Sequence, residues 1–323
     1  MGAGIVGGVI FGPNGMQPRD FARLALRSPV IGLGMVATWM LLFVPVARVI
    51  VRADAARYLR SLPSPRWPVV AISVGALVGF QLPWLVLWAA GAGPVGLAVV
   101  ALVTILIAGV AWWRFAPPKT GALRWRGPIA ALFGMYARAL RRRAADALMR
   151  CTGLAVLGGL AAGLFCRNNQ LESREAGVIG AAVIAVVLTP GWAGTLLPPI
   201  ETHRDSAWLA ATTGISEQAR RVALASIVVA IYLVTALLAA ICAITIAPDG
   251  AAWIFALTLA SAAGAGFVAT RAMIRSEHSD AMAMRVVIGA ILATAIVVVA
   301  LGALGATGAI AVLAIGGFAV GTA

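Results

Sequence analysis

The side chains of this sequence that could do acid–base chemistry lie outside its apolar stretches. The chain has 11 acidic residues, and each falls in an expected loop or at the edge of an apolar segment: Asp20, Asp54, Asp146, Glu172, Glu175, Glu201, Asp205, Glu217, Asp249, Glu277 and Asp280. Proton- and sodium-coupled carriers place ionisable groups within the helix bundle, where burial is costly and function retains them. The sequence therefore argues against ion-coupled transport and against carboxylate catalysis inside a membrane.

Metal and haem chemistry are not indicated either. The two histidines, His203 and His278, stand in expected loops without ligand spacing, and a lone loop histidine is usually a solvated side chain. The three cysteines form no Cys-x-x-Cys pair, and an odd number gives no disulfide framework: they are Cys151, Cys166 and Cys242. We expect no metal site and no cofactor.

ATP hydrolysis by a P-loop mechanism is excluded more firmly. The single lysine, Lys119, follows two prolines, and no glycine-rich loop precedes it to cradle a phosphate. The chain therefore has no P-loop of its own. We expect a protein that is not an enzyme by itself, at most the non-catalytic subunit of an ATP-dependent translocase.

Mild polar and aromatic residues stand beside prolines within the apolar stretches. Gln81 and Trp84 flank one proline, and Thr189 and Trp192 flank another. Proline frees a backbone carbonyl and bends a helix, so neighbouring hydroxyls or helices must satisfy that carbonyl. One interpretation is that these four residues line a substrate path, and the other is ordinary helix packing.

Composition places these residues in a membrane protein. Hydrophobic residues make up 62% of the 323, charged residues only 11%, and the mean hydropathy is +0.98, whereas soluble domains carry about 25% charged residues. A membrane span needs about 20 mostly apolar residues. We predict one all-α transmembrane domain over 1–323, a polytopic helical bundle of about eight or nine spans: 29–50, 69–90, 94–112, 149–166, 176–199, 222–247, 251–270, 286–304 and 306–323.

Turn-forming sequences and charge predict the sides of the membrane. The segments 91–94 and 247–250 contain glycine and proline and predict tight connections between spans. Loop 48–68 has five basic residues against one acidic, net +4, and loop 113–150 has nine against one, net +8. Basic loops stay in the cytoplasm, so both are expected inside. The net charge of +14 then reflects orientation in a bacterial inner membrane, and we expect no nucleic-acid partner.

Two basic amphipathic helices are expected on the cytoplasmic surface, near anionic membrane lipids. The first carries Arg19, Arg23 and Arg27 at a spacing of four. The second repeats apolar residues opposite a group of arginines: Phe133, Tyr136, Leu140, Ala144 and Leu148 against Arg138, Arg141, Arg142 and Arg143. A solvated basic loop is the alternative for the second. A single span at 29–50 puts the first helix outside, against the charge rule, so the side of the N-terminus stays open and a re-entrant 29–50 is the alternative.

Two of the expected cytoplasmic loops share a pattern. Tyr58-Leu59 and Trp208-Leu209 each begin a short helical stretch that ends in a proline or glycine followed by a serine. Transporters are often built from repeated halves. One interpretation is a parallel internal repeat with halves 1–148 and 149–323, and chance similarity is the alternative.

The same loops resemble the cytoplasmic loops of ABC-2-type exporter permeases. In those subunits an acidic-then-basic stretch with an aromatic-Leu pair ends in a Pro- or Gly-x-Ser turn before the next span. Here Glu201-Thr-His-Arg204-Asp205-Ser-Ala-Trp208-Leu209, followed by Gly214-Ile215-Ser216, is similar to that pattern, and Arg57-Tyr58-Leu59 begins a second similar stretch. The resemblance covers a small part of the chain, and the expected span count exceeds the number common in that family.

The resemblance implies a permease subunit, in a homo- or heterodimer, that works with a separate cytoplasmic ATP-binding subunit. A short helix in the loop would dock in a groove of the ATPase and transmit its motion to the spans, moving an amphipathic or hydrophobic substrate such as a peptide or lipid-like molecule. By carry-over the coupling residues would be Glu201, Arg204, Asp205, Trp208 and Leu209, with Arg57, Tyr58 and Leu59 as a second contact. Charges that merely cap helix ends are the alternative for these residues. A non-transporting scaffold or assembly factor, or an ion-coupled transporter, is the alternative for the protein.

Overall fold

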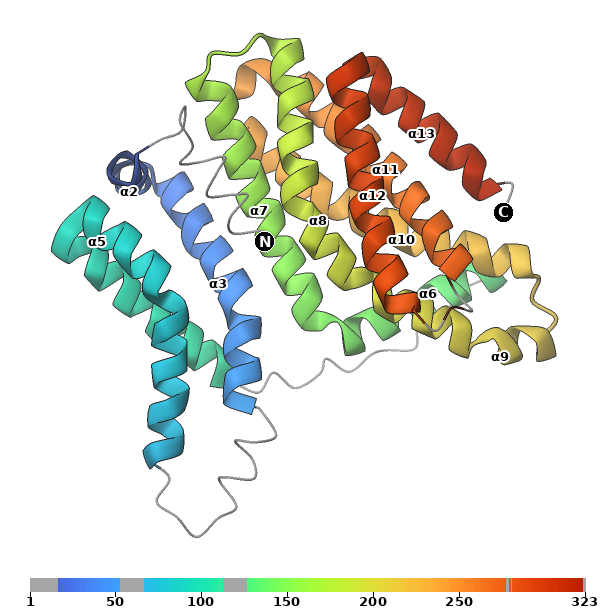
Figure 1. Cartoon of the computed structure of the whole chain (residues 1–323), viewed down its shortest axis with the longest axis horizontal. Helices are drawn as coiled ribbons and strands as arrows, with labels where there is room; N and C mark the ends of the chain where they lie inside the picture. Colours follow the sequence, from blue (N-terminus) through green and yellow to red (C-terminus); the bar gives the residue numbers. More distant parts are fainter. Residues whose placement is uncertain (1–16, 53–66, 113–126, 277–278, 280, 322–323) are drawn as a thin grey trace. The chain divides into compact units, whose positions relative to one another are not determined.

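The computed structural model describes residues 17–52, 67–112, 127–276, 279 and 281–321, and every regular element within them is helical (Figure 1). Seven of these helices are long and apolar enough to cross a membrane. The described part of the chain is therefore all-α, as predicted, and its length and apolarity indicate a multi-pass membrane protein. Contacts divide the chain into two compact units, an N-terminal unit containing 7–119 and a C-terminal unit containing 120–323.

The N-terminal unit contains three packed helices: α2 (Pro18–Arg27), α3 (Pro29–Arg52) and α5 (Trp67–Trp112). α5 is two helical segments joined at Gly93, whose φ of +57° is a backbone conformation that glycine adopts without strain. The break falls in the predicted connection at 91–94. Trp39 of α3 fastens this helix to α5, because its indole N–H donates to Gln81 Oε1 over 2.5 Å and its ring stacks on Trp84.

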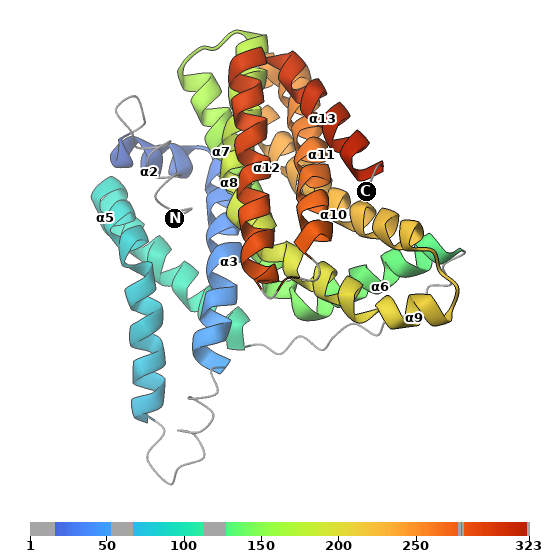
Figure 2. The same ribbon diagram turned by 45° about the vertical axis from the view of Figure 1, so that its right-hand side comes forward.

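The C-terminal unit contains the remaining helices: α6 (Pro128–Arg143), α7 (Ala145–Asn168), α8 (Ser173–Asp205), α9 (Ala207–Thr212), α10 (Glu217–Ile244), the 3-10 turn η1 (Pro248–Gly250), α11 (Ala251–Ser276), α12 (Met282–Leu304) and α13 (Ala306–Gly321). Figures 1 and 2 show the long helices gathered into a bundle, with α6 and α9 at one end. α6 packs there against α8 and α10. We name this the α9 end, and the opposite end, with η1 and the α7–α8 connection, the η1 end.

Small residues let the helices of this bundle approach closely. A Cβ added at Gly159 of α7 would lie 2.3 Å from the backbone oxygen of Ala239 in α10, and one at Gly163 would lie 2.8 Å from that of Ala243. On α8, a Cβ at Gly191 would lie 3.0 Å from the Cα of Cys151. Lipid tails are as apolar as the helices, so association depends on this close packing. Gly159, Gly163 and Gly191 are therefore positions of close helix contact.

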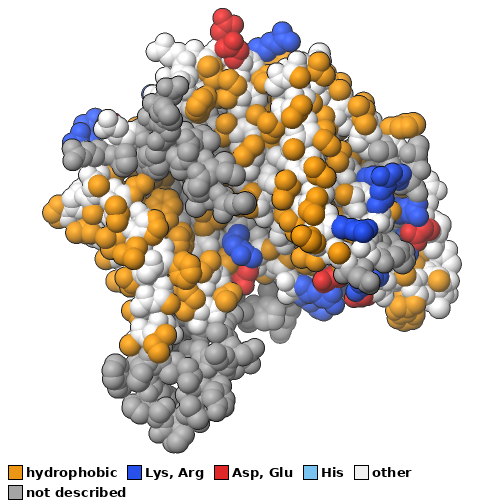
Figure 3. Space-filling view, viewed as in Figure 1, with side chains coloured by type: hydrophobic (Ala, Val, Ile, Leu, Met, Phe, Trp, Pro, Cys, Tyr) orange, Lys and Arg blue, Asp and Glu red, His pale blue; other side chains and the backbone are white. Residues whose placement is uncertain are grey.

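The outer surface of the C-terminal unit separates an apolar flank from a charged end. α12 exposes large aliphatic side chains along its length: Ile288, Ile291, Leu292, Ile296 and Val299. Figure 3 shows hydrophobic side chains over this flank and arginine and carboxylate side chains gathered near the α9 end. Such a division suits a bundle whose flank faces lipid and whose α9 end faces water.

Two details of this unit differ from the sequence prediction. The helix predicted from Phe133 to Leu148 is divided, because Ala144 has φ −126° and ψ 22° and separates α6 from α7. The apolar face of α6, with Tyr136 and Leu140, is buried against α8 and α10. That face therefore packs on protein, whereas a helix lying free in the headgroup layer would turn it toward lipid.

The span count and the internal repeat stay predictions. Seven helices qualify as spans, α5 is divided at Gly93, and α13 has 16 residues, which is short for a span. The boundary between the two compact units falls between residues 119 and 120 of the chain. The predicted halves, 1–148 and 149–323, divide at a different place. The arrangement therefore supports the helical bundle.

Candidate functional site

The α9 end begins where α8 stops. α8 ends at Asp205, and Ser206 follows with φ −90° and ψ 2°. The Ser206 hydroxyl donates to the backbone oxygen of His203 over 3.1 Å, so it partly satisfies a carbonyl in the last turn of α8. α9 starts at the next residue as a separate helix of six residues. Figure 2 shows α9 following directly on the end of α8.

The Gly-x-Ser turn ends α9 and starts α10. Gly214 has φ +68°, and the amides of Gly214 and Ile215 donate to carbonyls of α9 over 3.5 and 2.9 Å. This is the paired bonding of a Schellman helix end, in which glycine is preferred at the left-handed position. Ser216 then caps α10, because its hydroxyl accepts from the amide of Ala219 over 3.2 Å. Gly214, Ile215 and Ser216 thus end α9 and start α10 without an intervening loop.

α9 presents two large apolar side chains to its surroundings. Trp208 is 68% exposed and Leu209 is 42% exposed, whereas Ala210 is buried. The helix is too short to hold itself together by its own hydrogen bonds, so its position depends on the residues at both ends. An exposed tryptophan at a charged helix end is either an anchor in the membrane interface or an element of a protein interface.

The two helices that flank α9 in the chain share a buried polar cluster built on His203. The imidazole has no exposed surface, and its Nδ1 shares a hydrogen bond of 2.9 Å with the hydroxyl of Tyr136 from α6, which is also fully buried. The two rings are tilted, with centroids 6.1 Å apart. A histidine without exposed surface cannot reach a substrate directly, so His203 acts here by holding α6 against the end of α8.

Arg220 extends this cluster to α10. Its Nη2 donates to the backbone oxygen of His203 over 2.6 Å, and its Nη1 pairs with Glu217. Arg220 is only 6% exposed, and charge-assisted hydrogen bonds of this kind are about twice as strong as neutral ones. Glu217 is also 3.3 Å from Arg221 and 4.0 Å from His203 Nε2. The cluster therefore ties the last turn of α8 to the first turn of α10, on either side of α9.

A weaker ion-pair group covers the outer side of the same turn. Arg143, the last residue of α6, lies 3.8 Å from Glu201 and 4.0 Å from Asp205. All three side chains are about half exposed, and exposed pairs at such distances contribute about 0–1 kcal/mol. Arg204 adds a further contact with Asp205 at 3.9 Å. These pairs orient the end of α8 more than they stabilise it.

The structure brings five of the eight predicted coupling residues together. Glu201, Arg204 and Asp205 occupy the last turn of α8, and Trp208 and Leu209 occupy α9. The other three, Arg57, Tyr58 and Leu59, lie outside the described residues. The assignment of a coupling role to any of them stays a prediction.

The interpretation of His203 as a solvated loop side chain was wrong. Leu196, Pro199, Ile200 and His203 lie at helical spacing, and all four are buried. The apolar stripe of α8 thus continues to His203, one turn beyond the predicted end of the span at residue 199. That spacing was the signal that sequence reasoning missed. No comparable signal identified Arg220, because only the packing of α8 against α10 buries its guanidinium.

The four residues assigned to a substrate path are engaged in helix contacts. Gln81 and Trp84 join α5 to α3 through Trp39. Thr189 of α8 donates to Thr294 of α12 over 2.9 Å. Their role in a path stays a prediction.

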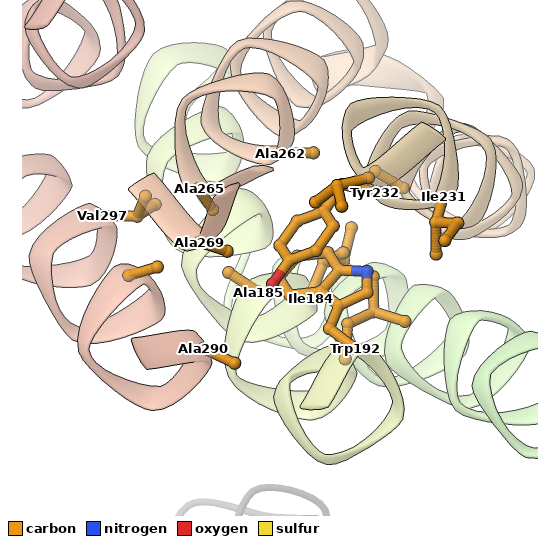
Figure 4. Packing of buried hydrophobic residues seen from close by; sticks show 14 of the residues in the cluster. Ile184, Ala185, Trp192, Ile231, Tyr232, Ala262, Ala265, Ala269, Ala290 and Val297 are labelled. Carbon is orange, nitrogen blue, oxygen red and sulfur yellow. The ribbon is translucent and has the colours of Figure 1, made fainter. Parts of the chain in front are cut away.

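Trp192, the fourth of these residues, lies in the interior of the C-terminal unit. Its indole N–H donates to Thr235 over 2.9 Å, and its ring stacks on Tyr232 with centroids 4.1 Å apart. Figure 4 shows this pair among small side chains of α8, α11 and α12, including Ala185, Ala265 and Ala290. The stack therefore fills space between helices.

Within the described ranges, no group of three or more histidine, cysteine or acidic side chains could hold a metal ion. Comparison with known proteins provides no relative to guide the assignment. No family model, no curated protein and no solved structure matches the chain. The functional argument therefore rests on the geometry of the α9 end.

Proposed function

We propose that this chain is the membrane-spanning permease subunit of an ATP-driven ABC exporter, with α9 as the helix that docks on a separate cytoplasmic ATPase. The observation that carries the proposal is the exposure of Trp208 and Leu209 on a short helix whose two flanking helices are joined by a buried polar cluster. The α9 end is then the cytoplasmic end. The chain moves an amphipathic or hydrophobic molecule, such as a peptide or lipid-like compound, across the inner membrane.

The exposed side chains of α9 support docking on protein. Tryptophan is enriched among residues that dominate protein interfaces, and a polar rim commonly surrounds the core of such an interface. Here Glu201, Arg204 and Asp205 provide charges next to Trp208. An anchor in the membrane interface is the competing explanation for the same tryptophan, and it is separated from docking by the experiment below.

The connection of α9 to the bundle supports transmission of motion. α9 joins α8 through Ser206 and α10 through Gly214 to Ser216, and Arg220 clamps the two long helices below it. Both α8 and α10 are candidate membrane spans. A push on α9 therefore reaches two spans together, without a flexible linker between the docking surface and the membrane.

The energy source in this proposal is another chain. The sequence has one lysine and no glycine-rich phosphate loop before it. Intramembrane carboxylates, which ion-coupled carriers use, are missing from the apolar segments of the sequence. A separate ATP-binding subunit that delivers its work mechanically accounts for both features.

The test is co-purification of the full chain, in detergent, with an ATPase subunit encoded beside its gene. Trp208→Ala should reduce the amount of ATPase recovered at least tenfold, because loss of a central interface tryptophan typically costs about 2 kcal/mol or more. Trp253→Ala is the matched control, since Trp253 is 41% exposed at the η1 end.

Two results would overturn the proposal. One is that the wild-type chain recovers no ATPase subunit. The other is equal recovery with Trp208→Ala and Trp253→Ala, which would assign Trp208 to the lipid interface.

A further inference from the structure

A cavity of about 560 Å³ opens at the η1 end of the C-terminal unit. It lies between the end of α7, the start of α8 and the connection from α10 to α11. Its volume falls within the range of about 300–1,000 Å³ that is usual for small-molecule sites. The α9 end contributes nothing to it, so the inference below is independent of the proposed ATPase coupling.

Two side chains of opposite charge line this cavity from segments far apart in the sequence. Arg167 comes from the last turn of α7, and Asp249 comes from η1. Within the described part of the chain, neither side chain takes part in an ion pair. A simple anion bound here would be repelled by the Asp249 carboxylate, and a simple cation would be repelled by the Arg167 guanidinium. A ligand that carries both charges satisfies both residues.

The backbone around the cavity is built into a fixed shape. α7 ends in a Schellman pair of bonds, from Gln170 N–H to Arg167 O and from Leu171 N–H to Cys166 O. Gln170 takes the left-handed position with φ +49°, where glycine is the usual residue. A strained residue at the rim of a cavity is typical of functional sites, and the amide of Gln170 brings one donor group and one acceptor group to it.

A second contact fixes the opposite wall. The Ser173 hydroxyl at the start of α8 donates to the backbone oxygen of Asp249 over 2.9 Å. This bond joins segments separated by 76 residues and holds η1 against α8. Arg167 and Asp249 therefore stand on walls whose backbones are held in place before any ligand arrives.

The rest of the lining is suited to carbon chains. Leu171, Ile246 and Ala247 contribute apolar surface, and the cavity lies where the apolar helices give way to charged residues. A polar head with a short aliphatic link matches this combination at the edge of a bilayer.

We infer that this cavity binds a small zwitterion, a phosphate or carboxylate group joined by a short carbon chain to an ammonium group. Arg167 binds the anionic group, and Asp249 binds the ammonium group. Gln170 donates to one and accepts from the other. The headgroup of phosphatidylethanolamine and free O-phosphoethanolamine share this chemistry, and the experiment distinguishes between them.

The test measures binding to the full chain purified in detergent. Native mass spectrometry follows retention of phosphatidylethanolamine, with phosphatidylglycerol as an anionic lipid that has no ammonium group. Isothermal titration with O-phosphoethanolamine follows the soluble ligand. The variants are Arg167→Gln and Asp249→Asn, both at exposed side chains. Arg174→Gln is the matched control, because Arg174 is exposed near the start of α8 but does not line the cavity.

The expected result is that Arg167→Gln and Asp249→Asn each weaken binding at least tenfold, which corresponds to 1.4 kcal/mol, whereas Arg174→Gln changes it less than twofold. Thr245→Trp, which fills the cavity from an exposed lining position, should abolish binding. Retention of the lipid without binding of O-phosphoethanolamine identifies the membrane as the source, and binding of O-phosphoethanolamine without retention of the lipid identifies a soluble ligand.

Three outcomes would overturn the inference. Equal retention of phosphatidylglycerol, with loss only in Arg167→Gln, would show a plain anion site. Equal binding by all variants would place the ligand elsewhere on the protein. Failure of both probes to bind the wild-type chain would leave the cavity as a solvent-filled crevice.

Discussion

Arg220→Ala is the perturbation that most sharply tests how α9 is held. Arg220 is nearly fully buried, donates to the backbone oxygen of His203 over 2.6 Å and pairs with Glu217. Its removal disconnects the first turn of α10 from the last turn of α8. α9 lies between those turns, so it should lose protection before the rest of the bundle does.

The magnitude follows from the contacts. A hydrogen bond from a charged donor contributes about 1.5–3 kcal/mol. The ion pair with Glu217 adds less than about 1 kcal/mol, because the carboxylate is half exposed. The oxygen of His203 keeps its contact with the Ser206 hydroxyl, which limits the loss. We therefore expect local destabilisation of about 2 kcal/mol, equivalent to roughly 30-fold more frequent opening.

Hydrogen exchange followed by mass spectrometry measures this opening directly. Amides in 203–216 should exchange about 30-fold faster in Arg220→Ala, whereas amides in the middle of α7 should be unchanged. Arg221→Ala is the matched control, because Arg221 contacts the same Glu217 from a more exposed position over 3.3 Å. Its effect should stay below about 0.5 kcal/mol, or roughly twofold.

Equal exchange in the wild-type chain and Arg220→Ala would refute the reasoning. So would equal acceleration in Arg220→Ala and Arg221→Ala, because it would show that the loss of a positive charge, and not the buried contact with His203, is what matters.

Three further predictions concern the bundle. Gly159→Ala should lower the melting temperature by roughly 5–10 °C, because a Cβ there meets a backbone oxygen of α10 at 2.3 Å, whereas Gly194→Ala, whose nearest atom is 4.0 Å away, should leave it unchanged or slightly higher. Gln170→Gly should raise stability in a thermal unfolding assay by about 1 kcal/mol, because it relieves the left-handed conformation; a lower melting temperature would show that the side chain contributes more than the strain costs. Trp39→Phe should cost about 1–3 kcal/mol by leaving Gln81 buried without its donor, and Gln81→Leu in the same chain should recover part of that loss; strictly additive effects would contradict the hydrogen bond.

Much of the fold was predictable because it follows from hydropathy and turn residues. The apolar stretches became long helices, and the connections predicted at 91–94 and 247–250 correspond to the break at Gly93 and to η1. Helix ends were harder, since α8 continues to Asp205 beyond the predicted span. Composition marks where a helix leaves the apolar layer, but a helix can continue past that point when other helices cover its next turn.

The candidate site was predictable only in its exposed part. The aromatic-Leu pair and the Gly-x-Ser turn stand close together in the sequence and identify α9. The buried cluster joins Tyr136, His203 and Arg220 from three helices. No local sequence pattern predicts contact between residues so far apart in the chain, because that contact results from the packing of α6 across α8 and α10. The cavity at the η1 end has the same origin, since Arg167 and Asp249 come together only through helix packing.

Photo-cross-linking from α9 in living cells tests the central claim most directly. A photoreactive amino acid placed at position 208 should form a covalent product with a P-loop ATPase subunit, identified by its peptides, and one placed at position 253 should not. Capture of membrane lipid alone at position 208, or the same products from both positions, would contradict the proposal that α9 docks on an ATPase.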